Sequence, residues 1–353
     1  AGVAIIGDNG AGKTNLLEAV YFLEIFRSFR GAHDEQLIRF GAEAFHIRGR
    51  FEDPSTGEQL EVTAAFERRG RRKRVTVNGA EPERLGDALG RIGVVVFSPS
   101  DVAIVAGAPA ERRRFLDIVL SLNSPGYLAA LQRYRHVLRQ RNAALKAGRD
   151  PSVIAAWSEG LVEHGVRIIA ARSAWIAAHA GGFAARCETI AGGAPVRMRY
   201  LCAAAPAAEC GAQDGAAVAE SFRRELARLQ AREFDRGTTL VGPHRDDVGL
   251  LVPRDGAEVD LRDYGSGGQQ RTAAIALRME EAQTVRAARG REPIVLLDDV
   301  FAELDPGRSR RILELLEAEE RGQALLTAPK ASDIELRGGS LGHWRIADGR
   351  VFT

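Results

Sequence analysis

The sequence predicts an α/β fold in which a mixed sheet, with parallel and antiparallel strands, is interrupted by a long helical insertion. Three observations support this prediction. A glycine-rich loop at 7–14 joins an apolar run to a helix-like stretch. The hydrophobic spacing changes to a helical period after Pro109, and strand patterns return near Ile294. We therefore expect two domains, one made of 1–100 plus 237–353 and one made of 101–236.

Composition limits the class of protein. A chain of 353 residues with 45% hydrophobic and 27% charged residues has the balance of a globular domain protein, and no apolar run is long enough to span a bilayer. The three cysteines, Cys187, Cys202 and Cys210, lack metal-ligand spacing. We therefore expect a reduced, cytoplasmic protein without a membrane partner.

The glycine-rich loop is the most informative motif. It follows the apolar run 3–6, opens the helical stretch 15–20, and reads Gly7, Asp8, Asn9, Gly10, Ala11, Gly12, Lys13 and Thr14. Glycines let backbone N–H groups turn toward a phosphate, and the helix directs its positive end at the same anion. Lys13 is expected to reach the β- and γ-phosphates of ATP, and the Thr14 hydroxyl to bind Mg²⁺.

The next elements, up to Phe97, are expected to be mainly strands. Residues 60–66 and 74–77 alternate apolar and polar side chains, and Asn78-Gly79 follows, which predicts antiparallel pairing. A basic cluster at 68–74 would then lie at a hairpin tip. Residues 94–97 form a short apolar run that predicts a buried strand.

Helices are expected from Pro109 to Arg236, at 127–146, 153–190 and 216–235, because apolar residues recur there at near-helical spacing. Trp157 and Trp175 are interpreted as packing residues of these helices. The segment 111–149 carries nine basic residues against Glu111 and Asp117, a net charge of +7. This segment and the cluster at 68–74 are candidate surfaces for a polyanion, with ordinary solvated arginines as the alternative.

The strand at 294–297 ends in two acids. Asp298 is expected to bind Mg²⁺ beside the glycine-rich loop, and Asp299 to act on the attacking water or, alternatively, to be a solvent-facing carboxylate. Upstream, Ser266, Gly267, Gly268 and Gln269 open another helix, and a helix start is an anion-binding end. Downstream, Leu304 and Asp305 follow the acidic pair.

This order of motifs resembles that of the ABC-type ATPases. Over essentially its whole length the chain resembles, among these, the RecF family of recombinational repair. The strings that carry the resemblance are 7–19, Phe97-Ser98-Pro99 with Asp101, 112–117, Gly242-Pro243-His244-Arg245-Asp246-Asp247, 266–272 and 296–305.

The chain departs from the pattern of these families at a few positions. The RecF family usually has Gln where this chain has Gly267, and Thr327 lies where transporters have a histidine. Asp299 stands where the superfamily has Glu, which is one methylene longer, so we expect slow ATP hydrolysis. We also expect that the natural N-terminus carries strands that precede Ala1. His244 either contacts the nucleotide-binding domain or anchors the returning chain, and we favour the structural role.

The resemblance implies a DNA-binding ATPase of repair and replication restart. Two heads would sandwich two ATP and two Mg²⁺, each ATP lying on one loop and capped by Ser266, Gly268 and Gln269 of the other head, with Asp305 communicating across the interface. The closed homodimer would hold double-stranded DNA near single-strand gaps. RecR and RecO would be partners in loading RecA, and the protein would be cytoplasmic and associated with the nucleoid.

Two alternatives remain open at this point. An ABC transporter nucleotide-binding subunit would explain Ser266-Gly267-Gly268-Gln269, but not a basic helical insertion of over one hundred residues. A chromosome-structural ATPase head with long coiled coils is the other alternative. The stretch 127–190 shows no sustained heptads, which argues against the coiled coils.

Overall fold

The computed structural model describes residues 2–53, 56–193, 195–205, 215–301, 304–319, 322–329, 341–347 and 349–353. The chain divides into two compact units. Unit 1 contains Ala1–Asp101 and Glu281–Thr353, and unit 2 contains Val102–Glu280. The sequence prediction placed the return of the chain at 237, whereas residues 237–280 lie within unit 2.

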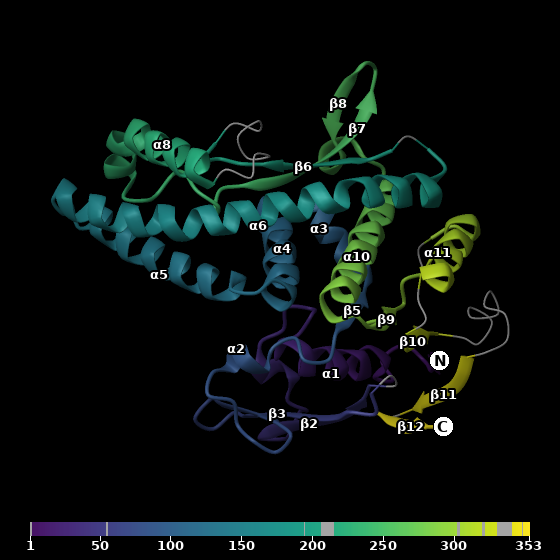
Figure 1. The fold of residues 1–353 in the computed structure, drawn as a ribbon. Coiled ribbons are helices and arrows are strands. Elements are labelled where there is room, and N and C mark those ends of the chain that lie inside the picture. Colours follow the sequence, from purple (N-terminus) through teal and green to yellow (C-terminus); the bar gives the residue numbers. More distant parts are fainter. Residues whose placement is uncertain are drawn as a thin grey trace. The chain divides into compact units, whose positions relative to one another are not determined.

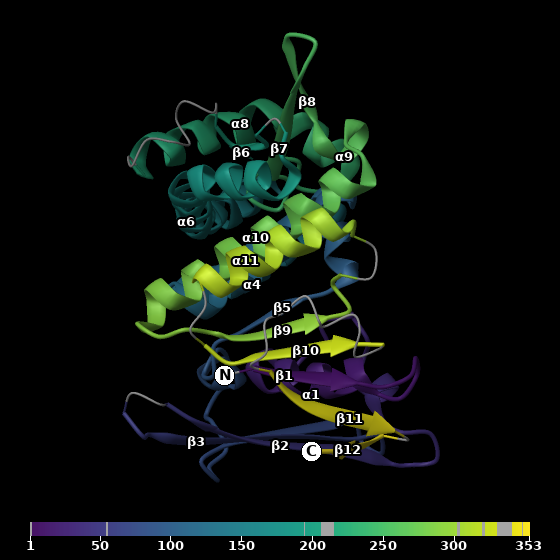
Figure 2. The ribbon, with the colours of Figure 1, turned by 90° about the vertical axis from the view of Figure 1, so that its right-hand side faces the viewer.

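Unit 1 is built on a six-stranded sheet with the order β12-β11-β1-β10-β9-β5 (Figures 1 and 2). Its strands are β1 (Gly2–Ile6), β5 (Val94–Phe97), β9 (Ile294–Asp298), β10 (Ala324–Ala328), β11 (Leu341–Ala347) and β12 (Arg350–Phe352). Neighbouring strands pair in parallel except β11 and β12, which are antiparallel. Five adjacent parallel strands therefore end at one edge, where the glycine-rich loop follows β1.

A second sheet of unit 1 is antiparallel and consists of β2 (Ala44–Glu52), β3 (Gln59–Glu67) and β4 (Arg72–Val77). Helix α1 (Lys13–Ile25) lies between the two sheets, where Leu17 and Phe22 share one core with Val62 of β3 and Val96 of β5. The β3–β4 turn carries the predicted basic cluster. Short helical turns η1 (Asp34–Leu37), α2 (Leu85–Ala88) and η2 (Pro99–Asp101) connect the strands, and α11 (Pro306–Glu319) precedes β10.

Unit 2 is mainly helical and contains a three-stranded antiparallel sheet. Its helices are α3 (Val102–Ala106), α4 (Pro109–Asn123), α5 (Tyr127–Lys146), α6 (Pro151–Ala191), α8 (Gly215–Arg236), α9 (Leu261–Tyr264) and the first part of α10 (Gly267–Arg289). The sheet has the order β6-β7-β8, formed by β6 (Arg197–Leu201), β7 (Asp247–Arg254) and β8 (Ala257–Asp260).

The long helices of unit 2 form where the sequence pattern predicts them. Proline starts α6, and the Asp150 side chain accepts a hydrogen bond from the Ser152 N–H at 2.8 Å, which caps the helix. Trp175 is buried in the core of the unit and meets Phe115 edge to face, and Trp157 packs against the same core. The prediction that both tryptophans are packing residues is confirmed. Within the described residues, no helix is long and apolar enough to cross a membrane.

Candidate functional site

The glycine-rich loop turns tightly between β1 and α1. Gly12 immediately precedes α1 with a φ of 106°, a backbone conformation that residues other than glycine rarely adopt. A Cβ on Gly7 would lie 2.4 Å from the carbonyl oxygen of Ile346, so β11 approaches the loop too closely for a larger residue. Lys13 Nζ donates to the Gly7 carbonyl at 2.6 Å and to the Asp8 carbonyl at 3.1 Å. The ammonium group therefore lies over the loop.

The carboxylate of Asp298 meets the loop because of the strand order. β10 lies between β1 and β9, and its Thr327 pairs in register with Ile5 on one side and with Asp298 on the other. The Thr14 hydroxyl donates to Asp298 Oδ1 at 2.9 Å, and the Thr327 hydroxyl donates to the same oxygen at 3.0 Å. The first turn of α1 and the ends of β9 and β10 are thereby joined through one carboxylate.

The environment of Asp298 suits a divalent cation. Burial raises the pKa of this carboxyl group, the Thr14 and Thr327 hydroxyls lower it, and the charge of Asp299 raises it further. Mg²⁺ prefers oxygen ligands and usually keeps several waters. A carboxylate beside the Thr14 hydroxyl therefore fits an ion that would also bind phosphate oxygens.

Asp299 has an unusual backbone. Its φ of 49° lies in the left-handed region, which is uncommon for residues other than glycine, asparagine and aspartate. The Asp299 N–H donates to the Thr327 hydroxyl oxygen at 3.0 Å. Strained conformations of this kind cluster at functional sites, and here the neighbouring strand holds the residue in place.

These groups line one cavity of about 260 Å³. Its lining residues are Asn9, Gly10, Gly12, Lys13, Thr14, Asn15, Arg30, Asp298, Asp299 and Thr327. The structure therefore brings together Lys13, Thr14, Asp298 and Asp299, which the sequence analysis had selected from two distant segments.

Arg30 is a site residue that the sequence analysis missed. Its guanidinium group donates to Asn15 Oδ1 at 3.0 Å and to Glu18 Oε1 at 3.1 Å, and it forms an ion pair with Glu18. The hydrogen bond that Arg30 donates to Glu18 is the main cause that raises the pKa of Arg30. Glu18 lies on the buried face of α1, and a buried carboxylate needs a cation as its partner. The sequence could therefore have indicated that a nearby arginine pairs with Glu18.

A larger cavity of about 1360 Å³ adjoins the first and shares Asn9, Gly10, Gly12 and Asn15 with it. Gly7, Asp8 and Ala11 also line it. Its far side contains Arg39, Phe40, His343 and Trp344, and the Phe40 side chain is fully exposed. An aromatic side chain beside a phosphate loop offers a stacking surface for a nucleotide base.

The remaining predicted residues lie elsewhere. Ser266, Gly268 and Gln269 belong to unit 2 at the exposed start of α10, where Gln269 Oε1 accepts from the Ser266 N–H at 2.9 Å and Ser266 Oγ accepts from the Gln269 N–H at 3.3 Å. Asp305 caps α11 by accepting from the Arg308 N–H at 3.0 Å, the main cause that lowers the pKa of its carboxyl group. Among the described residues lining the two cavities, none comes from the start of α10.

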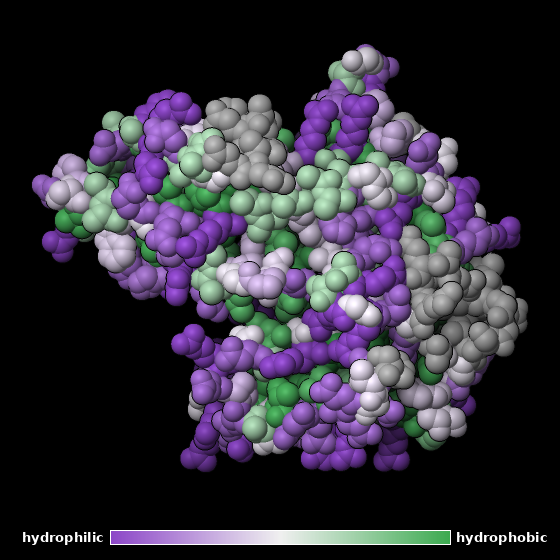
Figure 3. All heavy atoms as spheres, in the orientation of Figure 1, coloured by the Kyte–Doolittle hydropathy of each residue, from purple (hydrophilic) through white to green (hydrophobic). Residues whose placement is uncertain are grey.

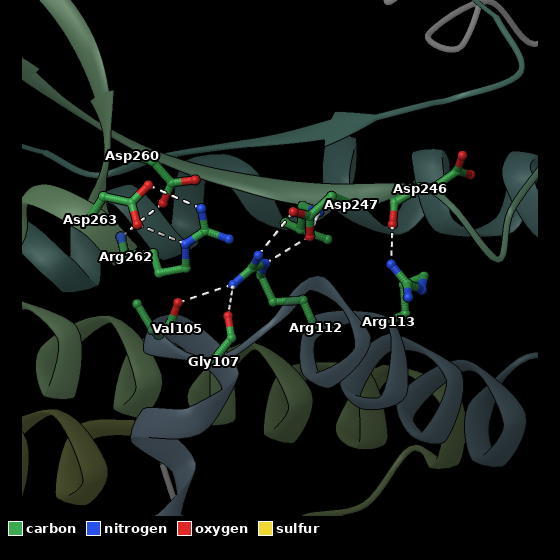
Figure 4. A network of polar contacts seen from close by, with 10 residues as sticks. Val105, Gly107, Arg112, Arg113, Asp246, Asp247, Asp260, Arg262 and Asp263 are labelled. Carbon is green, nitrogen blue, oxygen red and sulfur yellow. Dashed lines mark hydrogen bonds and ion pairs between the residues drawn. The ribbon is translucent and has the colours of Figure 1, made fainter. Parts of the chain in front are cut away.

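Asp246 and Asp247, which end the string 242–247, belong to a polar network within unit 2 (Figure 4). Arg112 of α4 donates to both carboxylate oxygens of Asp247, at 2.8 and 2.9 Å, and to the carbonyls of Val105 and Gly107. Arg113 donates to the Asp246 carbonyl at 2.7 Å. These residues fasten α4 to the start of β7.

His244 belongs to the same network. Tyr134 Oη lies 2.6 Å from His244 Nδ1, and His244 Nε2 lies 3.2 Å from the Thr239 carbonyl. Because a carbonyl only accepts, Nε2 carries the proton and Nδ1 accepts from Tyr134. Burial lowers the pKa of His244 to about 4, so the ring is neutral. Its interpretation as an anchor of the returning chain is confirmed.

Some members of the two basic clusters are structural. Lys73 donates to the Phe26 carbonyl at 2.8 Å and pairs with Asp34. Arg112 and Arg141 are almost completely buried in ion pairs with Asp247 and Glu233. These three cations are therefore not available to a polyanion, and the exposed arginines of each cluster remain candidates.

Comparison with known proteins shows which class of protein has this sequence and fold. Residues 2–337 match the sequence model of the RecF/RecN/SMC N terminal domain. Two Smc head domains of known structure, one of them from Pyrococcus furiosus, align with TM-scores of 0.56 and 0.54 at 14% and 12% identity, which shows a shared fold.

Nearer relatives are more specific. The DNA replication and repair protein RecF of Salinibacter ruber is 39% identical over 344 residues, covering 94% of this chain and 80% of that protein. Its counterpart from Moorella thermoacetica is 37% identical over 351 residues, covering 98% and 89%. The structure of the recombination mediator protein RecF-ATP in the RecFOR pathway aligns with a TM-score of 0.87 at 29% identity, covering 99% and 91%. The chain belongs to the RecF family of DNA replication and repair proteins.

Proposed function

We propose that this protein is an ATPase whose nucleotide-dependent dimerisation controls binding to DNA during recombinational repair. The observation that carries the proposal is the convergence of Lys13, Thr14, Asp298 and Asp299 on one cavity. The similarity to a RecF structure with ATP supports the identity of the nucleotide.

Within each subunit the roles follow from position. The loop N–H groups and Lys13 bind the phosphates, and the larger cavity beside Phe40 takes the base. Thr14 and Asp298 would hold Mg²⁺, which would neutralise charge on the phosphates. Asp299 would orient the attacking water or accept its proton, because it directly follows β9 and lines the same cavity.

Closure of two subunits would complete the site. Ser266, Gly268 and Gln269 lie at the exposed start of α10, where the first N–H groups of a helix are available to an anion. These residues of one subunit would cap the phosphates held by the other, with Asp305 at the same interface. ATP would then act by binding the closed dimer more tightly than the open one, and hydrolysis would release it.

DNA would be held by exposed arginines. At the β3–β4 turn of unit 1, Arg68, Arg69 and Arg72 of the basic cluster are exposed, and hydrophilic residues predominate along the lower edge of Figure 3, where β2 and β3 lie. Contacts of arginine with phosphates give salt-dependent binding that is largely independent of sequence. Membership of the RecF family supports double-stranded DNA near gaps as the target, with RecR, RecO and, indirectly, RecA as partners.

The proposal is tested by fluorescence anisotropy of a labelled gapped duplex, titrated with and without ATP. Tight binding only with ATP, lost in Lys13→Met, is the expected result. Ser266→Arg is the second variant, because it should retain ATP but lose both the dimer in analytical ultracentrifugation and the duplex. Binding of the duplex that ignores nucleotide would contradict the proposal.

A further inference from the structure

Unit 2 contains a cavity of about 210 Å³ that is separate from the two cavities of unit 1 and is lined by residues of α4, α5 and α6. It shares no lining residue with the nucleotide site. Because a water molecule takes about 30 Å³ of liquid volume, there is room for a phosphate group with part of its attached molecule. The charged residues that line it are Arg113, Arg114, Asp117, Arg135 and Arg172.

The charges in this cavity do not balance. Asp117 is the only carboxylate among the lining residues, and it accepts from Arg172 at 2.7 Å and from Arg135 at 3.1 Å. Four arginines against one aspartate leave a net charge of +3, since His244 is neutral. Arg172 is buried and Arg113 is half-buried, whereas Arg114 and Arg135 are exposed, so part of this positive charge is accessible to an anion from solvent.

The unused hydrogen-bond donors belong to the outer arginines. Arg172 is buried and fully engaged, with Tyr127, the Pro243 carbonyl and Asp117 as acceptors, so it forms a fixed wall. By contrast, Arg113 has one hydrogen-bond acceptor among the described residues, the Asp246 carbonyl, to which Nη1 donates, and burial together with the charge of Arg172 lowers the pKa of Arg113. For Arg114, no hydrogen bond or ion pair is found among the described residues.

We propose that this cavity binds a phosphate group through the guanidinium groups of Arg113, Arg114 and Arg135. Planar guanidinium donors match phosphate oxygens, and several of them converging on one cavity exceed what a single surface arginine offers. The phosphate belongs either to a nucleic-acid backbone or to a free phosphate compound. The first source rests on the proposed function, and the second does not.

The first experiment measures whether the cavity binds phosphate at all. Thermal unfolding is compared in inorganic phosphate and in chloride at equal ionic strength, with Lys13→Ala present throughout so that the nucleotide loop contributes little. Phosphate should raise Tm, because a ligand that binds only the folded state stabilises it. The increase should be lost in Arg113→Gln/Arg114→Gln. It should persist in the matched control Arg133→Gln/Arg139→Gln, which removes two exposed charges of α5 outside the cavity.

Arg114→Gln alone is the variant least expected to disturb the fold, because the Arg114 side chain has no polar partner among the described residues. It should by itself reduce the increase of Tm in phosphate. Equal increases in all variants would overturn the proposal.

The second experiment separates the two sources by duplex anisotropy with ATP in proteins that have Lys13 intact. If the backbone supplies the phosphate, Arg113→Gln/Arg114→Gln should weaken duplex binding at least tenfold more than Arg133→Gln/Arg139→Gln, a difference of about 1.4 kcal/mol that corresponds to roughly one charge-assisted contact. If the two pairs are equal while the phosphate effect on Tm persists, the source is a free phosphate compound. Failure of the wild-type protein to bind duplex would contradict the proposed function and leave the phosphate experiment intact.

Discussion

Thr14 and Asp298, 284 residues apart in the sequence, are joined by a hydrogen bond of 2.9 Å from the threonine hydroxyl to the aspartate Oδ1. The contact connects the first turn of α1 to the end of β9. Both residues would bind Mg²⁺, so the two protein ligands of the cation are already adjacent. The protein needs little rearrangement here to accept the ion.

Asp298→Asn should abolish Mg²⁺-dependent ATP hydrolysis and yet stabilise the protein without nucleotide. Burial raises the pKa of Asp298 in the folded state, so the folded form binds more protons than the unfolded form at pH values between the two pKa values. The charged carboxylate therefore costs stability above that range, and the cost disappears as the pH falls through the folded pKa.

We expect Tm of Asp298→Asn to exceed that of the wild type by roughly 1–4 °C at neutral pH. The difference should shrink as the pH is lowered, as measured by thermal unfolding in EDTA. Destabilisation at neutral pH would contradict the expectation. Lys13→Ala is the control that loses ATP without altering this carboxylate.

Thr327→Val should lower the rate of hydrolysis more than the affinity for ATP. The hydroxyl donates to Asp298 and accepts from the Asp299 N–H, so its loss leaves an unpaired N–H beside a strained residue. Thr327→Ser keeps both hydrogen bonds and should retain most activity. Steady-state hydrolysis gives kcat, and fluorescence of a labelled ATP analogue gives Kd. A tenfold or greater fall in kcat with Kd changed less than threefold is expected on the scale of one or two lost hydrogen bonds, each worth about 1 kcal/mol. A larger effect on Kd than on kcat would assign Thr327 to nucleotide binding.

The sequence predicted best those site residues whose motif is formed by consecutive residues. Lys13 and Thr14 could be identified because loop, strand and helix are consecutive, and Asp298 because it ends an apolar strand. β2, β6, β7, β8, β11 and β12 were not predicted. In β2, Phe45, Ile47 and Phe51 alternate with polar residues, but Gly49 interrupts this pattern, because a side chain there would meet Leu23 and Phe51.

The partners of buried charges were beyond the sequence for another reason. Arg112 meets Asp247 across 135 residues and Arg141 meets Glu233 across 92, and composition alone counted both arginines as free cations. Only the packing of α4 and α5 shows which arginines are consumed internally. The same holds for Thr327, whose role follows from the register of β10 against β9.

Asp299→Asn should reduce kcat by about 10²–10⁴-fold, the usual contribution of a general base, while the nucleotide still binds. Asparagine tolerates the left-handed backbone, so the fold should be preserved. Asp299→Gly serves as the companion variant because it relieves the backbone strain and also removes the carboxylate. It should be equally inactive but at least as stable. Single-turnover hydrolysis with saturating ATP is the measurement, and activity within threefold of the wild type in both variants would make Asp299 a surface carboxylate.

The buried pair Arg141–Glu233 should be the most sensitive point of unit 2. Its side chains are 2% and 0% exposed, with Nη2 and Oε2 2.6 Å apart, and Arg141 also donates to Thr239 and Ser158. Arg141→Met leaves the Glu233 carboxylate buried without its cation, which costs about 3–5 kcal/mol.

Adding Glu233→Gln should recover part of that loss, because the amide oxygen can still accept from the Leu240 N–H as Glu233 does at 2.7 Å. The exposed pair Arg223–Glu159 is the control, and Arg223→Met should change the stability little, because solvent screens an exposed ion pair. Thermal unfolding followed by helical circular dichroism compares the variants. A fall of roughly 6–20 °C for Arg141→Met, partly reversed by the second substitution, is expected if unit 2 unfolds cooperatively. Equal effects of Arg141→Met and Arg223→Met would mean that the buried carboxylate finds water or protonates at little cost.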